Sequence, residues 1–319
     1  AFIDVSYTPR QGLKHSIGVD YFDEDLDIND FGFLRRNDVI SARYKLEITE
    51  SDLEKYKTRE FSLFLNQEYN TDGRLVRSGI FTNRKYKFHN NHFLFTELNY
   101  FPSRWDDTNS AGNGDFKIDP RWQLGGFYST DSAKKISHGF AAFFNQEEIG
   151  GQEHVWKYEI SWRPSDRFSA QLELRYINRT DWLLHQSGRD FTTYKAEFWQ
   201  PELELDYFLT AKQQFRITAQ WVGIKAFERD RWQVPVGDGS LIPDTAPATD
   251  TRDFSISRLV FQARYRWEIA PLSDLFVVYT RGSNLPNSPE ESFSDLLHKS
   301  WTNRAVDVFV IKLRYRLGS

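Results

Sequence analysis

The sequence contains no cysteine, so it can form neither a disulfide bond nor a thiolate metal site. It has no apolar run approaching the roughly 18 residues that a membrane-spanning helix requires. Its 41 lysines and arginines stand against 45 aspartates and glutamates, giving a formal net charge of −4, so no basic excess points to nucleic acid. These absences exclude a disulfide-stapled domain, a helical membrane protein and a basic nucleic-acid binder.

Large aromatic side chains are abundant even though the chain is polar. Hydrophobic residues make up only 39% of the sequence, yet aromatic residues reach 16%. Transmembrane β-barrels combine these properties, because lipid-facing and lumen-facing residues alternate and rings gather in girdles at both membrane interfaces. Rings such as Trp156, Trp162 and Phe227 stand near the ends of predicted strands. We therefore favour a membrane barrel over a β-sandwich, whose core would place its rings in mid-strand.

The dominant hydrophobic period is two, from one end of the chain to the other. In "RLVFQARYRWEI" (258–269) and "VFVIKLRYRL" (308–317), one face is apolar and the other carries charges. A charged second face predicts side chains in a wet lumen, where they either line an open channel or pair across it and plug it. The candidates for lining this lumen are Arg43, Lys45, Arg175, Glu202, Glu204, Arg258, Arg264, Arg266, Lys312, Arg314 and Arg316.

Short polar turns alternate with longer connections along the chain. "RPSDRF" and "APLSDL" are short, whereas "DEDLDINDFGFLRRND" and the segment "NRTDWLLHQSGRD" are long. This predicts an all-β fold, an antiparallel transmembrane β-barrel with about 14 to 16 visible strands, short periplasmic turns and long extracellular loops. We expect one outer-membrane barrel domain over residues 1–319.

The direction of the strands gives a further expectation about the chain. The usual barrel ends on a strand that runs toward the periplasm, and about fifteen strands can be counted back from "DVFVIKLRYRL". The first strand would then also run toward the periplasm, which an even-stranded barrel does not allow. We therefore expect this sequence to be the C-terminal part of a longer protein, with one or more N-terminal strands missing.

Motifs of enzyme chemistry are lacking. The seven histidines are scattered, and no G-x-S-x-G, H-E-x-x-H or glycine-rich phosphate loop occurs. Glu202 and Glu204 could serve as an acid–base pair, but their spacing of two is explained by the wet face of a strand. We expect no catalytic residue, no cofactor and no metal site. Weak calcium candidates, more simply explained as solvated loop residues, are Asp23, Asp25, Asp27, Asp107 and Asp115.

The stretch "INDFGFLRRND" (28–38) joins the second and third predicted strands. Its aromatic residues could cap the barrel rim on the extracellular side. Its charged residues could form a rim ion cluster that sets the loop geometry, since exposed pairs add only about 0–1 kcal/mol each. These rim residues are Asp30, Arg35, Arg36 and Asp38.

Several segments resemble a group of Gram-negative outer-membrane proteins. In these proteins a module like a family 9 carbohydrate-binding domain precedes a C-terminal β-barrel domain of unknown function. The segments that carry the resemblance are "LDINDFGFLRRND", "LFLNQEYNTDG", "WQLGGFYSTDSAKK", "WRPSDRFSAQLELRY", "RWEIAPLSDLFVVYTRG" and "DVFVIKLRYRL". They match the barrel part only, and Leu317 stands where such barrels usually finish on phenylalanine. The resemblance implies location and architecture, and it supplies no catalytic residue.

Together these observations lead to one main hypothesis and three alternatives. The chain is expected to be an integral β-barrel of the bacterial outer membrane, a channel or receptor that passes or captures a solute, for which a saccharide is one candidate. Its expected partners are outer-membrane lipid and lipopolysaccharide, the solute and other proteins, with no nucleic acid. The alternatives are a plugged barrel that serves as a scaffold for partner proteins or an N-terminal binding module, a surface hydrolase, and a soluble all-β protein.

Overall fold

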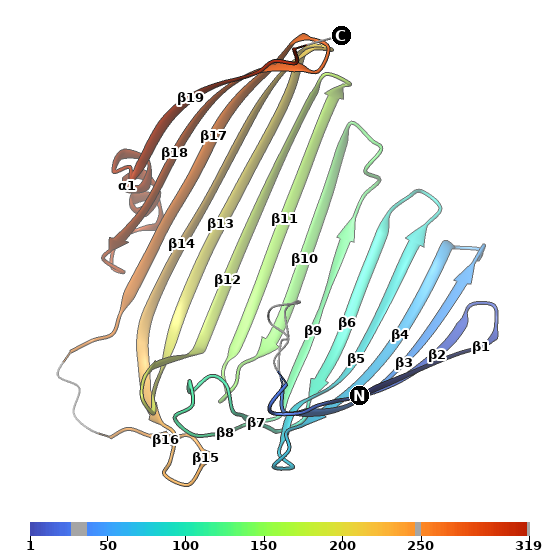
Figure 1. Cartoon of the computed structure of the whole chain (residues 1–319), viewed down its shortest axis with the longest axis vertical. Helices are drawn as coiled ribbons and strands as arrows, with labels where there is room; N and C mark the ends of the chain where they lie inside the picture. Colours follow the sequence, from blue (N-terminus) through green and yellow to red (C-terminus); the bar gives the residue numbers. More distant parts are fainter. Residues whose placement is uncertain (27–36, 246–249, 318–319) are drawn as a thin grey trace.

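A computed structural model describes residues 1–26, 37–245 and 250–317, and it consists almost entirely of β-strands. One large antiparallel sheet dominates it (Figure 1). The strands along this sheet, in spatial order, are β1 (Phe2–Arg10), β2 (Leu13–Phe22), β3 (Val39–Ser51), β4 (Tyr56–Tyr69), β5 (Leu75–Phe88), β6 (Phe93–Phe101), β9 (Arg121–Ser129), β10 (Ile136–Gln146), β11 (Gln152–Ser165), β12 (Phe168–Ser187), β13 (Asp190–Thr210), β14 (Gln213–Gln233), β17 (Phe254–Ala270), β18 (Ser273–Asn287) and β19 (Val306–Arg314).

Each strand on this path pairs with its neighbour in the sheet, and the sheet remains open. In the described part of the chain, β1 pairs only with β2, and β19 pairs only with β18. Of the sixteen strands in the sheet, β16 (Ile242–Pro243) lies off the path and leaves fifteen along it. Strict antiparallel alternation over an odd number makes β1 and β19 point the same way, so direct pairing of the two edges would be parallel. The predicted all-β antiparallel architecture is confirmed, whereas a closed barrel is not formed.

The connections differ in length at the two ends of the strands (Figure 1). At one end, here called the short-turn end, two to six residues join successive strands, as at 11–12, 166–167 and 271–272. The other end, the long-loop end, carries β7 (Arg104–Asp106), β8 (Phe116–Ile118), β15 (Gly239–Ser240) and α1 (Phe293–Thr302). The three short strands form a separate sheet in the order β15-β8-β7.

One predicted long connection was wrong. Residues 178–190 were expected to form a loop, but β12 continues to Ser187 and only Gly188 and Arg189 join it to β13. Gly188 has φ +51°, a left-handed conformation that glycine adopts without strain. Strand pairing persists because Trp182 packs against a buried cluster and Leu183 packs against another. Their burial outweighs the polar composition that suggested a loop.

The two faces of the sheet differ in chemistry. The apolar face carries large side chains that remain open to the surroundings, such as Leu124 at 50% and Trp156 at 47% exposure. The opposite face, here called the charged face, carries acidic and basic residues that are more enclosed and bonded to one another, for example Glu97 and Gln123, 3.0 Å apart. This is the reverse of a water-soluble sheet, in which the apolar face is covered.

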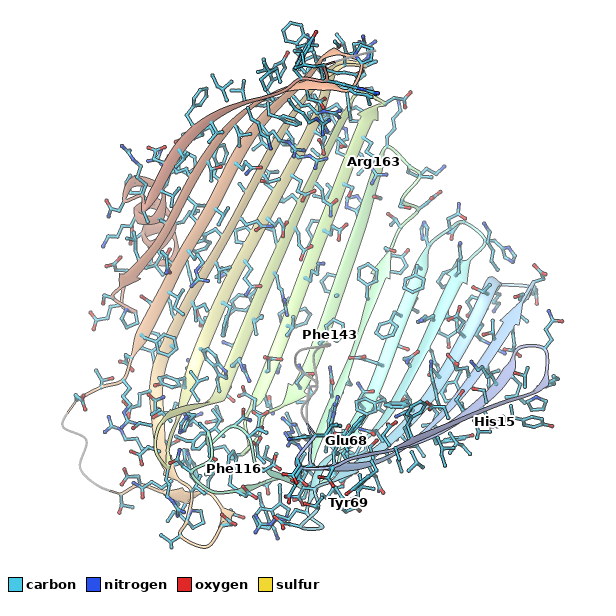
Figure 2. All side chains as sticks on the ribbon, viewed as in Figure 1. His15, Glu68, Tyr69, Phe116, Phe143 and Arg163 are labelled. Atoms are coloured by element: carbon cyan, nitrogen blue, oxygen red, sulfur yellow. The ribbon has the colours of Figure 1, made fainter. Side chains whose placement is uncertain are left out.

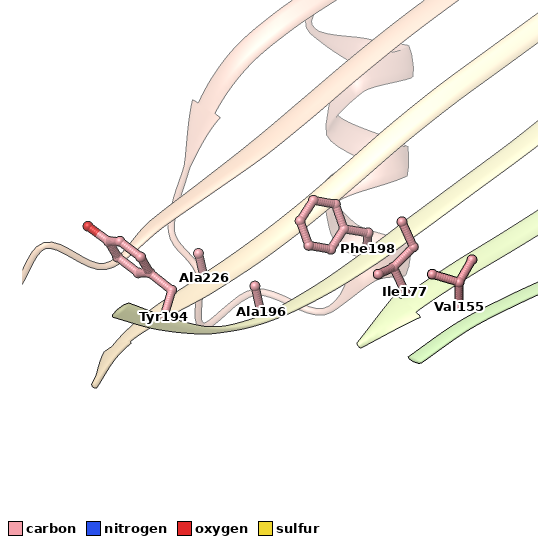
Figure 3. Packing of buried hydrophobic residues seen from close by; sticks show 6 residues of the cluster. All are labelled: Val155, Ile177, Tyr194, Ala196, Phe198 and Ala226. Atoms are coloured by element: carbon pink, nitrogen blue, oxygen red, sulfur yellow. The ribbon is translucent and has the colours of Figure 1, made fainter. Parts of the chain in front are cut away.

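Apolar clusters lie on both sides of the sheet toward the long-loop end. Figure 3 shows Ile177, Phe198 and their neighbours on one side of the strands, with the helix α1 on the other side. Helix α1 covers part of the apolar face, where Leu296 packs against Trp221 and Leu259. No helix in the described ranges is long and apolar enough to cross a membrane.

Candidate functional site: the charged face

The strand registers place the predicted lumen-lining residues on one face of the sheet. Arg43 lies opposite Gly18 and Asn66, Glu202 lies opposite Glu173, and Arg264 lies opposite Arg216. Arg316 follows β19, and its backbone amide donates to Ser273 Oγ. The structure thus brings together, on strands of the charged face, Arg43, Lys45, Arg175, Glu202, Glu204, Arg258, Arg264, Arg266, Lys312 and Arg314.

A row of three glutamates crosses the middle of this face. Glu159, Glu173 and Glu202 stand directly opposite one another on β11, β12 and β13. Like charges in direct cross-strand register destabilise a sheet. Lys157 offsets part of this repulsion, because its Nζ lies 2.8 Å from Glu173 and 3.9 Å from Glu159. Glu202 instead accepts a hydrogen bond from Gln220. The packing of the sheet does not require glutamate at these three positions. Together they form a band of negative charge across the face.

Basic residues gather on the same face toward the short-turn end. Arg216 and Arg264 are direct cross-strand partners. Asp274, almost fully buried, is bridged by Arg266 at 2.9 Å and by Arg314. Carboxylates lie at this level too, because Arg216 Nε is 2.8 Å from Asp206, so the basic groups here are partly neutralised.

The N-terminal strands carry a bridged cation. The Arg43 guanidinium lies 2.6 Å from Asp4 on β1 and also binds Asp20 on β2. Its neighbour on the same face, Lys45, pairs with Glu47 at 2.6 Å. The predicted lumenal cations here are thus bound to carboxylates of their own sheet.

Phenylalanines lie flat on the charged face, over glycines. A Cβ on Gly125 would fall 2.2 Å from the Phe143 ring, and a Cβ on Gly79 would fall 2.5 Å from the Phe81 ring. Phe81 also packs edge-on against Phe101, with ring centroids 5.4 Å apart. Glycine at these positions leaves room for the rings, so the charged face has an aromatic floor between its polar groups.

A hollow of about 370 Å³ lies where β7 approaches this floor. Phe81 and Phe101 form its wall on the sheet side, and Arg104, Asp106 and Asn109 line its other side. Burial lowers the pKa of the Arg104 guanidinium from its ordinary value. The Asp106 carboxylate, 3.7 Å away, opposes this shift, and it also accepts hydrogen bonds from the turn that follows it. The β7–β8 segment thus reaches the charged face at the long-loop end.

A second hollow of about 200 Å³ shares Phe101 and Arg121 with the first. Its ionic groups are mutually paired, as in the contact between Arg121 and Glu148 at 2.5 Å. Two enclosed atoms have no hydrogen-bond partner within the described residues: the donor Arg121 Nε and the acceptor Asn145 Oδ1. A hydroxyl group, which both donates and accepts, has the chemistry to satisfy this combination.

Glu147 lies at the side of this hollow, in the loop after β10. Its side chain is only 1% exposed and binds Arg179 Nε at 2.6 Å. It also accepts a hydrogen bond from the Asp181 amide. Burial raises the pKa of this carboxyl, and the Asp181 amide and Arg179 oppose that shift. Arg179 also lies 3.3 Å from Glu153 and over the Trp182 ring.

Arg74, Asp115 and Asp238 form a cluster, here called the loop clamp, that joins separate loops at the long-loop end. The sequence did not predict this cluster. Arg74 binds both Asp115 and Asp238, in the latter case at 2.9 Å. The Asp115 amide also donates to Asp238 Oδ1 across 123 residues of sequence. The hydrogen bond from Asp115 and that from Arg74 lower the pKa of the Asp238 carboxyl. No local pattern could have paired residues so far apart.

The calcium candidates take other roles where they are described. Asp23 accepts hydrogen bonds from the Asp25 amide and the Tyr21 hydroxyl, whereas Asp115 binds Arg74. Asp107 lines the larger hollow, and Asp27 lies outside the described residues. Over the ranges that the structure covers, no three acidic or histidine side chains gather as a metal site.

The predicted rim cluster can be placed only in part. Asp30, Arg35 and Arg36 lie outside the described residues. Asp38 adopts φ 50° and accepts a hydrogen bond from the Thr71 amide at 2.8 Å. It therefore joins the start of β3 to the loop after β4.

The chain was compared with known proteins. No curated protein matches it significantly. A family model described as a domain of unknown function, DUF5916, matches residues 5–318. Because this match extends over nearly the whole chain, the protein belongs to the DUF5916 family.

Proposed function

We propose that the chain forms the wall of an outer-membrane β-barrel that passes or captures a polar solute. The observation that carries this proposal is the inverted distribution of polarity across the sheet. Apolar side chains such as Leu124 and Trp156 are about half exposed, while charged groups are enclosed and paired on the opposite face. Lipid against the apolar face and water against the charged face would satisfy both. The resemblance to Gram-negative outer-membrane barrels supports this location.

A barrel can close on this sheet in two ways. Because β1 and β19 point the same way, their direct pairing would be parallel, whereas antiparallel closure would take an odd number of strands from another polypeptide segment. Both edges are open to pairing, because β1 and β19 are exposed along their length. Unpaired edges would otherwise be aggregation-prone, and barrels remove them by closure.

The charged face is suited to a polar, uncharged solute near the long-loop end. The ionic groups around Arg121 are already paired, and the enclosed Nε and Asn145 Oδ1 offer one donor and one acceptor to hydroxyl groups. Phe101 adds an apolar wall for the face of a ring. These features support a saccharide-like solute over a simple ion.

Two neighbouring cysteine substitutions test the membrane arrangement, because the native chain has no cysteine. Lys157 and Tyr158 are adjacent on β11 and point to opposite faces. In lipid vesicles, Lys157→Cys should react with a water-soluble maleimide, whereas Tyr158→Cys should be protected. Denatured samples provide the control, in which both must react. Equal reaction of both variants in intact vesicles would contradict the proposal.

Conductance then separates an open channel from a barrel that only captures solute. The full chain, reconstituted in a planar bilayer, should show discrete conductance steps. Protein that inserts, by the maleimide measurement, yet never conducts would rule out the open channel.

A plugged scaffold is the second candidate function, favoured by the β7–β8 segment. Phe116 and Ile118 of β8 are fully buried together with Phe191, Val234 and Leu241, so the loops form a compact core of their own. This core also includes Phe191 of β13, so it fixes the loops to the end of the main sheet, where they could hold partner proteins. Recovery of a partner at fixed stoichiometry after detergent extraction would favour this function.

A further inference from the structure

A separate hollow lies at the short-turn end, far from the loop clamp. Its volume is about 420 Å³, and it opens between the β9–β10 turn and the β11–β12 turn. Figure 2 shows Arg163 at this end of the sheet, opposite the end where Phe116 lies. The Arg163 amide bonds to the Lys135 carbonyl and thereby joins the two sides of the hollow.

The lining of this hollow is strongly basic. It includes four cations against one carboxylate, that of Asp166. Within the described residues, none of the four cations lies within ion-pair distance of a carboxylate, in contrast to Arg43, Arg121 and Arg179 elsewhere on the sheet. The nearby Asp131 carboxylate accepts hydrogen bonds from Ala133 and Asn91. The four cations are Lys134, Lys135, Arg163 and Arg167.

The remaining lining residues add hydroxyl groups and apolar walls. Ser132, Ser165 and Ser169 bring hydroxyls to the hollow, and Phe208 brings a ring on the charged face. Phe168 instead packs its ring against Trp162 and Tyr207. Cations and hydroxyl donors together are the usual partners of phosphate oxygens in proteins. The Phe208 ring favours a phosphate that carries an organic group over the inorganic ion.

We propose that this hollow binds the phosphate group of an organic phosphate. The site goes beyond the proposed function, because residues in and next to the short turns form it and it does not require a closed barrel. Two sources share this chemistry: a soluble phosphate monoester and the headgroup of an anionic phospholipid. Arg163 follows Trp162 on β11, so alternation along the strand places it on the charged side, which favours the soluble source.

The test measures binding to the full chain in detergent at low ionic strength, with glycerol 3-phosphate and adenosine monophosphate as soluble probes. The double variant Lys135→Ser/Arg163→Ser removes two of the four cations. Its matched control is Lys55→Ser, an exposed lysine in the β3–β4 turn at the same end of the sheet. Circular dichroism of all variants verifies that the sheet is intact. A parallel arm measures sedimentation with phosphatidylglycerol vesicles and with phosphatidylcholine vesicles.

We expect the native chain and Lys55→Ser to bind a phosphate probe alike, and the double variant to bind about tenfold more weakly or not at all. Added salt should weaken this binding, because the cations are exposed. Binding confined to phosphatidylglycerol vesicles, and lost in the double variant, would support the lipid as source. Equal binding by the double variant and the native chain, or binding to no phosphate in either arm, would overturn the proposal.

Discussion

Arg179 of β12 holds the buried Glu147 carboxylate with a hydrogen bond of 2.6 Å from its Nε. The two residues are 32 positions apart in the sequence, with Glu147 in the β10–β11 connection and Arg179 within β12. This ion pair joins the loop after β10 to the long β12–β13 hairpin, beside the hollow that contains Arg121.

Removing one member of this pair should be costly. In Arg179→Met, the enclosed Glu147 carboxylate keeps the Asp181 amide but loses its cation, so we expect a loss of about 3 kcal/mol in the free energy of unfolding. Urea titration in detergent measures it. The control is Arg59→Met, which breaks an exposed pair with Glu50 and should cost at most about 1 kcal/mol. Equal losses in the two variants would show that burial of Glu147 is unimportant.

Acid should weaken the Asp238 contact of the loop clamp, whereas burial raises the pKa of the Asp115 carboxyl that Arg74 also binds. Hydrogen bonds from Asp115 and Arg74 lower the pKa of Asp238 in the folded state. A lowered folded pKa means that the contribution is complete above the unfolded value of about 3.9 and is lost as pH falls through the folded value. The hydrogen-exchange protection of residues 104–118 and 234–241, taken relative to the intrinsic exchange rate at each pH, should therefore be high at pH 5 and lower below the folded pKa. Asp238→Asn should show low protection at both values, and high protection in this variant would contradict the clamp.

A methyl group at Gly125 should disturb the aromatic floor. The Cβ of Gly125→Ala would fall 2.2 Å from the Phe143 ring and 2.8 Å from the Ala142 carbonyl oxygen. We expect a destabilisation of about 1–3 kcal/mol from this overpacking. Gly282→Ala is the matched control, because its Cβ would meet its nearest neighbour, the Leu259 carbonyl oxygen, at an ordinary 3.5 Å. Urea midpoints that are the same for both variants would show that the Phe143 ring moves away freely.

The glutamate row should set ion selectivity if the barrel conducts. Replacing Glu173 and Glu202 by glutamine removes two negative charges from the charged face while keeping their size. We expect the reversal potential in a salt gradient to shift toward anions. Glu50→Gln, in an exposed pair, should leave it unchanged. No shift in the double variant would place the row outside the conduction path.

Much of the sheet could be predicted from local sequence. Side chains alternate strictly between the faces of a strand, so a period of two in "RLVFQARYRWEI" suffices to place Arg258, Arg264 and Arg266 on one face. The prediction failed at residues 178–190, where polar composition suggested a loop. There the burial of Trp182 and Leu183 against distant segments keeps the chain paired as a hairpin.

The sequence could predict which face of the sheet carries the candidate site, but it could not predict the contacts between the residues of that site. Alternation along each strand was sufficient to place residues on the charged side, because it is a local property of the backbone. The folded chain was needed to show that Arg74 bridges Asp115 and Asp238, that β7 reaches the hollow lined by Phe81 and that the two sheet edges stay apart. These relationships depend on loop paths and strand curvature, which arise from contacts between residues far apart in sequence and leave no periodic trace in it.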